Sequence, residues 1–377
     1  MILQHLSVIN YRNLRAVDLD FSRNVNCLVG ANGMGKSNVL DAIYCLSFCR
    51  GFASAQDALN VHHEEDFFLL NGVYETEAGH TMRVSCALKR GGRKRLKVDE
   101  KDVKRLSEHM GRIPMVIIAP TDSELINGGS EERRRFMDTV IMQYNPPYLD
   151  ALMRYDRALK QRNTLLKQEA DPDDAVMDVL EAMMSEAAQS VYEERCRFVS
   201  EFRPLFLDLY RRLSGQSREV VDMVYESHVS RGDLLQQLKS GRERERIVGY
   251  TLHGIHKDEL TLSLGGFGVK REASQGQQKT YFIAMKLAQF VFLRNKGEQH
   301  TPLLLLDDIF DKLDEQRVAR IIDYVSSEDF GQIFITDTKR DHLDRILSAT
   351  QKDYKLFCVT DGDVQDAGSA DYSGGWR

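Results

Sequence analysis

The N-terminal part of the chain alternates between apolar and polar positions, which is the pattern of β-strands. Residues 2–11 (ILQHLSVINY), 16–22 (AVDLDFS) and 24–30 (NVNCLVG) each predict a strand, and a Gly-rich loop follows the third. Residues 36–52 then place apolar side chains at helical spacing. A strand, a Gly-rich loop and a helix in this order predict the opening of an α/β nucleotide-binding unit.

The periodicity changes further along the chain. Residues 67–99 alternate again, with turn signals at 78–79 and 91–92, and predict an antiparallel subsheet. From 131 to about 246 apolar residues recur at helical spacing, with breaks at Pro and Gly, and after 249 strand and helix patterns alternate once more. We therefore expect an α/β fold whose domains are 1–130 (first part of the head, with the β subdomain), 131–248 (helical arm), 249–362 (second part of the head) and 363–377 (flexible tail).

Composition narrows the class of protein. The chain has 377 residues, 42% of them hydrophobic, and a formal net charge of −6, so contacts to nucleic acid have to come from local basic patches. Its six cysteines form no CxxC pair, and no apolar run reaches the length of a signal peptide or a membrane span. We expect a cytoplasmic protein with no membrane partner.

Residues 30–37, GANGMGKS, match the phosphate-binding loop G-x-x-x-x-G-K-[ST] between the predicted strand and helix. Glycines let backbone amides surround phosphate, Lys36 neutralises the β and γ oxygens, and the Ser37 hydroxyl suits Mg²⁺. The loop predicts ATP and Mg²⁺ as cofactors. The nucleotide-binding residues that we expect are Arg12, Gly30, Asn32, Gly33, Gly35, Lys36, Ser37 and Asn38.

A phosphate loop needs an acidic residue on the metal side, and the run LLLLDD at 303–308 supplies two. Four leucines predict a strand that is buried on both faces. Asp307 would hold Mg²⁺ with Ser37, and Asp308 would orient or deprotonate the attacking water. Together with Lys36 they are the expected catalytic residues.

The stretch ASQGQQK at 273–279 precedes an amphipathic helix. It is either an ordinary Ser N-cap or a second anion site, because a helix start offers free amides and a positive dipole end. The order of motifs decides between the two. The chain resembles ABC-type ATPases of the SMC-like branch, in which a helical arm interrupts the head. The resemblance rests on the order of its features: phosphate loop, helical insertion, Ser-x-Gly-Gln turn, Leu-run with two acids and the triplet 312–314.

This resemblance implies a homodimer that encloses ATP. Ser274, Gly276 and Gln277 of one copy would meet the nucleotide held by the other, and Asp314 would lie at the dimer interface. Arg12 and Asn32 would reach the nucleotide, although a surface Arg and a loop Asn with local bonds are the alternatives. Candidates for the γ-phosphate sensor are Thr336 and Thr338.

Several shorter motifs of the chain resemble those of the RecF family of bacterial recombination mediators. They lie at residues 10–14 (NYRNL), 119–122 (APTD), 132–138 (ERRRFMD), 256–260 (HKDEL) and 304–308 (LLLDD). The resemblance implies an ATP-driven dimer that binds double-stranded DNA and gapped DNA junctions in repair of DNA damage, with RecR (with RecO) and ultimately RecA as partners. Because Asp308 is one methylene shorter than the Glu usual in ABC proteins, we expect a weak ATPase, and the resemblance implies that DNA stimulates it.

The basic stretch 89–95 predicts either a hairpin tip that grips DNA phosphates or a solvated tip. Its DNA-binding candidates are Arg90, Arg93, Lys94 and Arg95. Three other classes of protein compete with the mediator. A structural SMC-like tether would need longer unbroken heptads, a transporter subunit would need a less charged arm, and a nuclease would need a further acidic domain.

Overall fold

The structure is a computed structural model that describes residues 1–52, 54, 56–169, 172–215, 219–297, 301–310, 313–326, 330–338 and 353–367. The chain forms two compact units. The first contains Met1–Asp122, Arg212–Gly215 and Lys279–Arg377, and the second contains Ser123–Arg211 and Gln216–Gln278. The predicted arm, 131–248, lies in the second unit apart from Arg212–Gly215.

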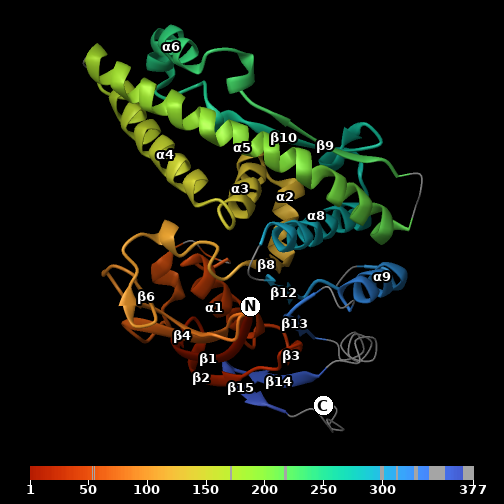
Figure 1. Cartoon of the computed structure of the whole chain (residues 1–377). Helices are drawn as coiled ribbons and strands as arrows, with labels where there is room; N and C mark the ends of the chain where they lie inside the picture. The colour runs from red at the N-terminus through yellow and green to blue at the C-terminus, as the bar shows by residue number, and fades with distance from the viewer. Residues whose placement is uncertain are drawn as a thin grey trace. The chain divides into compact units, whose positions relative to one another are not determined.

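The first unit contains a largely parallel sheet of six strands (Figure 1). In spatial order its six strands are β15 (Asp363–Asp366), β14 (Tyr354–Thr360), β3 (Val25–Val29), β13 (Ile333–Asp337), β12 (Leu303–Asp307) and β8 (Met115–Ile118). Only β15 is antiparallel to its neighbour. Strands β12 and β13 are buried along their whole length, so the predicted Leu-run is a central strand. The carboxyl ends of β3, β13 and β12 therefore meet at one edge of the sheet.

The second sheet of this unit is antiparallel, and it confirms the predicted β subdomain. Its order is β2 (Leu14–Asp20), β1 (Ile2–Tyr11), β4 (Phe67–Glu75), β5 (Thr81–Lys89), β6 (Arg95–Val98) and β7 (Lys101–Asp102). Gly79 and Gly91 occupy the two predicted turns with φ of 77° and 72°, a conformation that glycine adopts without strain.

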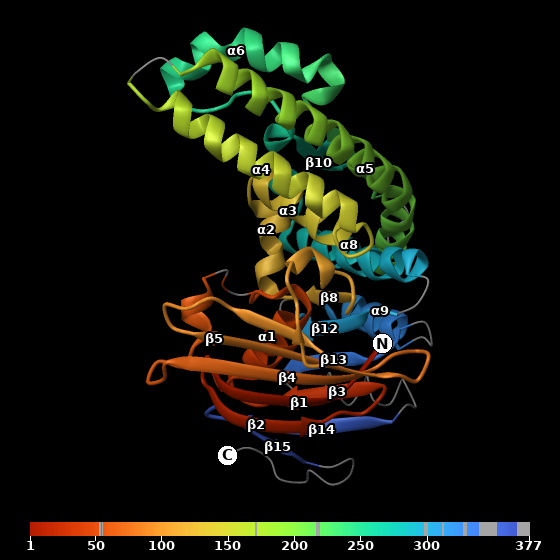
Figure 2. The same ribbon diagram turned by 60° about the vertical axis from the view of Figure 1, so that its left-hand side comes forward.

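Helix α1 (Lys36–Phe48) lies between the two sheets of the first unit (Figure 2). It contacts β1, β4 and β5 of the antiparallel sheet and β8, β12 and β13 of the parallel one. Its apolar residues are buried on every side, including Val39, Leu40, Ile43 and Leu46, which are all fully buried. The helix that follows the phosphate loop is thus the centre of the core. The unit also contains α9 (Glu315–Val325).

The second unit combines helices with a small sheet. Helices α4 (Pro146–Leu166) and α5 (Asp174–Ser214, of which Arg212–Ser214 belong to the first unit) run side by side, and α6 (Leu234–Val248) lies at one end of this pair (Figure 1). Shorter helices are α2 (Glu124–Asn127), α3 (Ser130–Ile141) and α7 (Val269–Glu272). Helix α8 (Gln275–Lys296) begins in this unit and continues in the first. Single 3₁₀ turns cover Val229–Arg231 and Ile255–Lys257 in this unit, Asp57–Asn60 and Leu106–Glu108 in the first unit, and Pro120–Ser123 where the two units join along the chain.

The small sheet was not expected within the helical stretch. Strand β9 (Val221–Glu226) pairs with β10 (Glu259–Leu264), which pairs with β11 (Phe267–Gly268). Val221 and Met223 are buried while Val224 is exposed, so β9 alternates between its faces as an edge strand does. Its pairing partner comes from beyond the predicted end of the arm, and pairing between distant segments is invisible to local periodicity.

The C-terminal segment also departs from expectation. Residues 363–366, predicted as the start of a flexible tail, form strand β15 on β14. The turn between the two strands uses Asp361 and Gly362 at φ of 50° and 81°, and Val364 is buried. Residues 368–377 lie outside the described part of the chain. Among the described helices, none combines the length and the apolar character that crossing a bilayer requires.

Candidate nucleotide-binding site

The phosphate loop joins β3 to α1, and its glycines are required by the backbone. A Cβ on Gly30 would lie 2.3 Å from the Val359 carbonyl oxygen. Gly35 has φ of 115°, and a Cβ there would lie 2.8 Å from the Asn13 side chain. The loop thus passes close to its neighbours and adopts a conformation that other residues avoid. Gly33, at φ of 83°, and Asn32 are exposed in the same loop.

Lys36 lies folded over the loop. Its Nζ donates hydrogen bonds to the carbonyl oxygens of Gly30 at 2.8 Å and Ala31 at 2.9 Å. Burial lowers the pKa of Lys36, and the nearby carboxylates of Asp308 and Asp307 oppose that shift. An ammonium whose hydrogen bonds go to carbonyl oxygens is suited to exchange them for the stronger acceptors of a phosphate.

The Ser37 hydroxyl lies directly against the acid of β12. It donates a hydrogen bond of 2.8 Å to Asp307 Oδ1, which also accepts one of 2.7 Å from Thr336 Oγ1 on β13. Burial raises the pKa of Asp307, and the two hydroxyl donors work against that shift. A hydroxyl and a buried carboxylate at this spacing form a hard oxygen donor set, so the pair that was predicted to hold Mg²⁺ is chemically suited to it.

Asp308 follows Asp307 with a left-handed backbone, at φ of 49°. Its amide donates to Thr336 Oγ1 at 3.1 Å and to the Thr336 carbonyl oxygen at 3.3 Å. Asp tolerates this region better than most residues because its short side chain interferes little with the backbone. Thr336 therefore fixes the carboxylate of Asp307 and the backbone of Asp308, and its hydroxyl is engaged within the site. Its predicted role as γ-phosphate sensor stays a prediction, as does that of Thr338, which is exposed just after β13.

Asn13 braces the loop from the turn between β1 and β2. Its Nδ2 donates to the Met34 carbonyl oxygen at 3.2 Å, and its Oδ1 accepts a bond of 2.7 Å from Asn38 Nδ2. The predicted nucleotide residue Asn38 therefore contacts a residue that was matched to the family motif but not predicted as part of the site. The signal for Asn13 lies only in the NYRNL pattern.

Arg12 pairs with a carboxylate of the central helix. Its Nε lies 2.6 Å from Asp41 Oδ2, and its guanidinium donates to Asn60 Oδ1 at 3.0 Å. Asp41 is fully buried and also accepts from the Tyr11 hydroxyl at 2.8 Å and from the Phe52 amide at 2.6 Å. Sequence reasoning missed Asp41, because one acid on an apolar helix carries no local mark of its partners.

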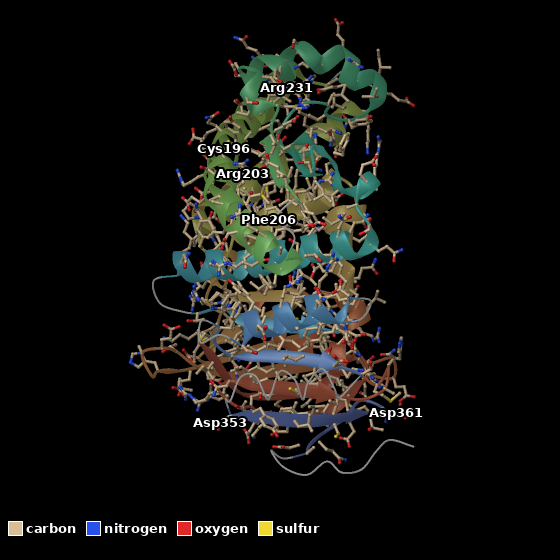
Figure 3. All side chains as sticks on the ribbon, turned by 90° about the vertical axis from the view of Figure 1, so that its right-hand side faces the viewer. Cys196, Arg203, Phe206, Arg231, Asp353 and Asp361 are labelled. Atoms are coloured by element: carbon tan, nitrogen blue, oxygen red, sulfur yellow. The ribbon has the colours of Figure 1, made fainter. Side chains whose placement is uncertain are left out.

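The turn after β14 completes the surroundings of the loop. Asp353 and Asp361 mark the two ends of this strand (Figure 3). The Gly362 amide donates to the Met34 carbonyl oxygen at 2.9 Å, and a Cβ on Gly362 would lie 2.1 Å from the Asn13 carbonyl oxygen. Two segments that are distant in sequence, the turn at Asn13 and the end of β14 with its following turn, thus hold the phosphate loop.

The Ser-x-Gly-Gln turn belongs to the second unit, where it begins α8. The Gln277 amide donates to Ser274 Oγ at 3.3 Å, and the Ser274 amide donates to Gln277 Oε1 at 2.8 Å. This is a reciprocal capping box with Gln at its third position. Ser274 is exposed, and Gly276 lies inside the first turn. The structure thus contains the predicted helix cap, while the role of the turn toward a second copy stays a prediction.

Asp314 caps α9. Its Oδ1 accepts from the Arg317 amide at 2.9 Å, and its Oδ2 lies 3.2 Å from Arg317 Nε. The side chain is 58% exposed, so it is accessible for the predicted interface. Lys312 of the same triplet lies outside the described residues.

The basic hairpin divides into two kinds of cation. Arg90 donates to carbonyl oxygens of Glu65 and His62 at 2.8 and 2.9 Å, and Lys94 bonds to the Cys49 carbonyl oxygen and to Asp57. These bonds tie two of the four DNA-binding candidates to the head itself. Arg93 and Arg95 are exposed.

Comparison with known proteins gives one consistent result. The model of the RecF/RecN/SMC N terminal domain family matches residues 2–363. A DNA replication and repair protein RecF from Phocaeicola vulgatus is 52% identical over 97% of this chain and 98% of the relative. The protein of that name from Porphyromonas gingivalis is 47% identical over 97% of this chain and 100% of the relative.

Solved structures agree. The structure of the recombination mediator protein RecF-ATP in the RecFOR pathway has a TM-score of 0.86 and 26% identity, covering 97% of this chain and 98% of that one. An Smc head domain from Pyrococcus furiosus has a TM-score of 0.57 and 16% identity, covering 97% of this chain and 96% of that one, and shares the fold alone.

The fold and the phosphate loop beside the acids of a central strand define an ABC-type P-loop ATPase head of the SMC-like class. Within this class, the chain belongs to the RecF family of DNA replication and repair proteins.

Proposed function

We propose that this protein is an ATP-dependent recombination mediator. Two copies close on ATP, bind duplex DNA near single-strand gaps and help to load recombinase, and slow hydrolysis then dissolves the dimer. The observation that carries the proposal is the bond from Ser37 to Asp307, which brings a phosphate loop to a Leu-run acid in a chain 52% identical to a RecF protein.

Binding of ATP follows from the loop. The amides of the loop at the start of α1 and the Lys36 ammonium receive the β and γ phosphates, and Lys36 gives up its bonds to Gly30 and Ala31. Ser37 and Asp307 would hold Mg²⁺, which supplies positive charge to the phosphate oxygens when bound. The RecF-ATP structure supports ATP as the nucleotide, and the donor set at Ser37 and Asp307 supports the metal.

Hydrolysis depends on Asp308, which orients or deprotonates the attacking water. Its carboxylate is one methylene shorter than that of Glu, and its backbone is held by Thr336. A short side chain on a fixed backbone reaches less far toward the water, which supports slow turnover. ATP binding then acts as a switch and hydrolysis as its timer.

Closure of the dimer would use the turn at Ser274. Its exposed hydroxyl and the amides at the start of α8 offer a second set of phosphate donors. Asp314, exposed at the start of α9, would lie at the same interface. The other proposed partners are RecR with RecO, and the RecFOR pathway named for the related RecF-ATP structure supports them.

The central experiment measures dimer mass and duplex binding with ATP, with ADP and without nucleotide. Wild type is expected to dimerise and to bind DNA more tightly with ATP only. Lys36→Arg should lose both responses, because a guanidinium cannot occupy the place of the ammonium within the loop. Ser274→Arg should still bind ATP as a monomer but should neither dimerise nor hydrolyse it. If ATP changes neither mass nor DNA binding in wild type, the proposal fails.

A second experiment concerns DNA contacts. Replacing the exposed cations Arg93 and Arg95 with Ser should lower duplex affinity and reduce the salt dependence by about one unit of slope for each lost phosphate contact. Arg244, an exposed cation of α6, is a matched control. An unchanged salt slope in the Arg93 and Arg95 variant would place the DNA surface elsewhere.

A further inference from the structure

The Gln277 side chain makes hydrogen bonds at both ends of its amide. Its Oε1 accepts from the Ser274 amide at 2.8 Å, which closes the capping box. Its Nε2 donates to Glu219 Oε1 at 2.8 Å. The second bond fixes the plane and the direction of the amide, so it also determines where Oε1 meets Ser274.

Glu219 is itself held from α5. Its Oε2 accepts a hydrogen bond of 2.6 Å from the hydroxyl of Tyr210. Tyr210 is 1% exposed, and its ring lies 6.2 Å from the ring of Phe206 on the preceding turn, which Figure 3 labels on the same helix. A buried ring permits little movement of the hydroxyl, so the position of the carboxylate follows the position of α5.

The carboxylate of Glu219 holds the Gln277 side chain more strongly than a neutral group would. Hydrogen bonds to a charged acceptor are stronger than those between neutral groups. Negative charge is also favourable beside the first turn of α8, where the helix dipole is positive.

Gln278 holds the same turn by a separate bond, because its Nε2 donates to the Ala273 carbonyl oxygen at 3.1 Å.

We propose that Glu219 is a positioning residue for the turn 274–277. It holds Gln277 so that Ser274 is presented in one geometry to the nucleotide of a second copy, and it links that turn to α5 through Tyr210. The inference rests on the proposed role of this turn in ATP-driven dimerisation. It also provides a means of regulation, because a ligand that shifts the end of α5 at Tyr210 would change the geometry of the turn and so the strength of ATP-dependent dimerisation.

Three variants of the full chain test the link. Glu219→Ala removes both bonds, Glu219→Gln can keep both by donating to the Tyr210 oxygen and accepting from Gln277, and Tyr210→Phe removes only the bond to α5. Each is measured for ATP affinity as a monomer, for its urea unfolding transition and for its dimerisation constant with ATP.

Glu219→Ala is expected to weaken ATP-dependent dimerisation about 10-fold or more, because a symmetric dimer contains two such turns. Its ATP affinity as a monomer should stay at the wild-type value. Glu219→Gln should dimerise within about 3-fold of wild type, and Tyr210→Phe should lie between the two. A purely structural role would not give this order at constant monomer affinity. If Glu219→Gln is as weak as Glu219→Ala, the hydrogen-bond link is wrong.

Mixed dimers separate a defective turn from a defective fold. Glu219→Ala chains combined with Lys36→Arg chains form one composite site with an intact loop and an intact turn. At a protein concentration at which Glu219→Ala alone is largely monomeric, hydrolysis should therefore rise when the two preparations are mixed, and the lack of any rise would overturn the inference.

Failure of the inference and failure of the proposed function are distinguishable. If Glu219→Ala dimerises like wild type while Ser274→Arg does not, only the link through Glu219 is wrong. If Ser274→Arg also dimerises like wild type, the proposed function of the turn is wrong.

Discussion

Thr336 donates a hydrogen bond of 2.7 Å to Asp307, one strand away in the parallel sheet. The same hydroxyl accepts from the Asp308 amide at 3.1 Å. One fully buried side chain thus fixes the carboxylate that faces Ser37 and the backbone of the residue beside it. The carboxylate of Asp307 and the backbone of Asp308 are thus ordered by the protein itself, which is the preorganisation that electrostatic catalysis requires.

Thr336→Val tests this arrangement, because it keeps the shape and removes the hydroxyl. We expect stability to fall by about 1–2 kcal/mol, since Asp307 loses a donor within a buried site. Hydrolysis should fall about 10-fold with little change in ATP affinity. Thr336→Ser, which keeps the hydroxyl, should retain most of the activity. Steady-state phosphate release and urea unfolding measure the two effects, and equal loss in both variants would contradict the assigned role.

Asp308→Glu separates the effect of side-chain length on hydrolysis from the effect of backbone strain on stability. The longer carboxylate should speed hydrolysis, whereas the left-handed backbone at φ of 49° should cost about 1 kcal/mol of stability for a residue with a longer side chain. Asp308→Asn should bind ATP and hydrolyse almost none. If Asp308→Glu and wild type release phosphate at similar rates, the explanation of slow turnover by side-chain length is wrong.

Glu245 balances a fully buried cation in the second unit. Arg162 Nη1 lies 2.6 Å from Glu245 Oε2, and Arg162 Nη2 lies 2.9 Å from Glu181 Oε1, with all three side chains buried. Glu181 also pairs with Arg242 at 2.6 Å, so removing Glu245 leaves positive charge without its partner, and Glu245→Ala should cost about 3–5 kcal/mol. Glu243→Ala, an exposed position of the same helix, should cost under about 0.5 kcal/mol. Urea unfolding followed by circular dichroism compares the two.

Because of His256, we expect the folded protein to be less stable in mild acid. It lies 2.7 Å from the Tyr155 hydroxyl and 3.1 Å from the Thr251 carbonyl oxygen. Burial, with smaller contributions from Lys257 and Arg134, lowers the pKa of His256 to about 4 from an ordinary value near 6.5. The unfolded chain therefore takes up a proton first as pH falls.

Stability should accordingly be complete above pH 6.5 and should decline by up to about 3 kcal/mol as pH falls toward 4. His256→Gln, which can still donate to the Thr251 carbonyl, should lose stability at neutral pH but show a shallower decline. Urea unfolding at pH 7.5, 6 and 5 gives both slopes. Parallel slopes in wild type and variant would assign the acid sensitivity to other groups.

Local patterns were sufficient to predict the head. The loop at 30–37 and the run at 303–308 each combine a hydrophobic period with residues whose chemistry is specific, so the buried strand and the contact between Ser37 and Asp307 could be predicted from the sequence. Strand β9 could not, because its alternation over Val221–Glu226 is short and its partner β10 is distant.

The supporting residues were equally hidden. Glu219 is a single acid in a polar stretch and Asp41 a single acid in an apolar helix, and only the fold brings their donors together. For the same reason the sequence could not show that Arg90 and Lys94 are tied to the head while Arg93 and Arg95 are exposed.

Asp41 has a consequence for genetics. One buried carboxylate joins Tyr11 and Arg12 at the end of β1 to Phe52 after α1, by hydrogen bonds from Tyr11 and Phe52 and an ion pair with Arg12. Replacing it with Asn would keep the shape but remove the charge that these three partners share. Such a lesion loosens several segments at once without touching nucleotide, and it is the kind of change that yields a temperature-sensitive allele: functional in the cold and lost with modest heating.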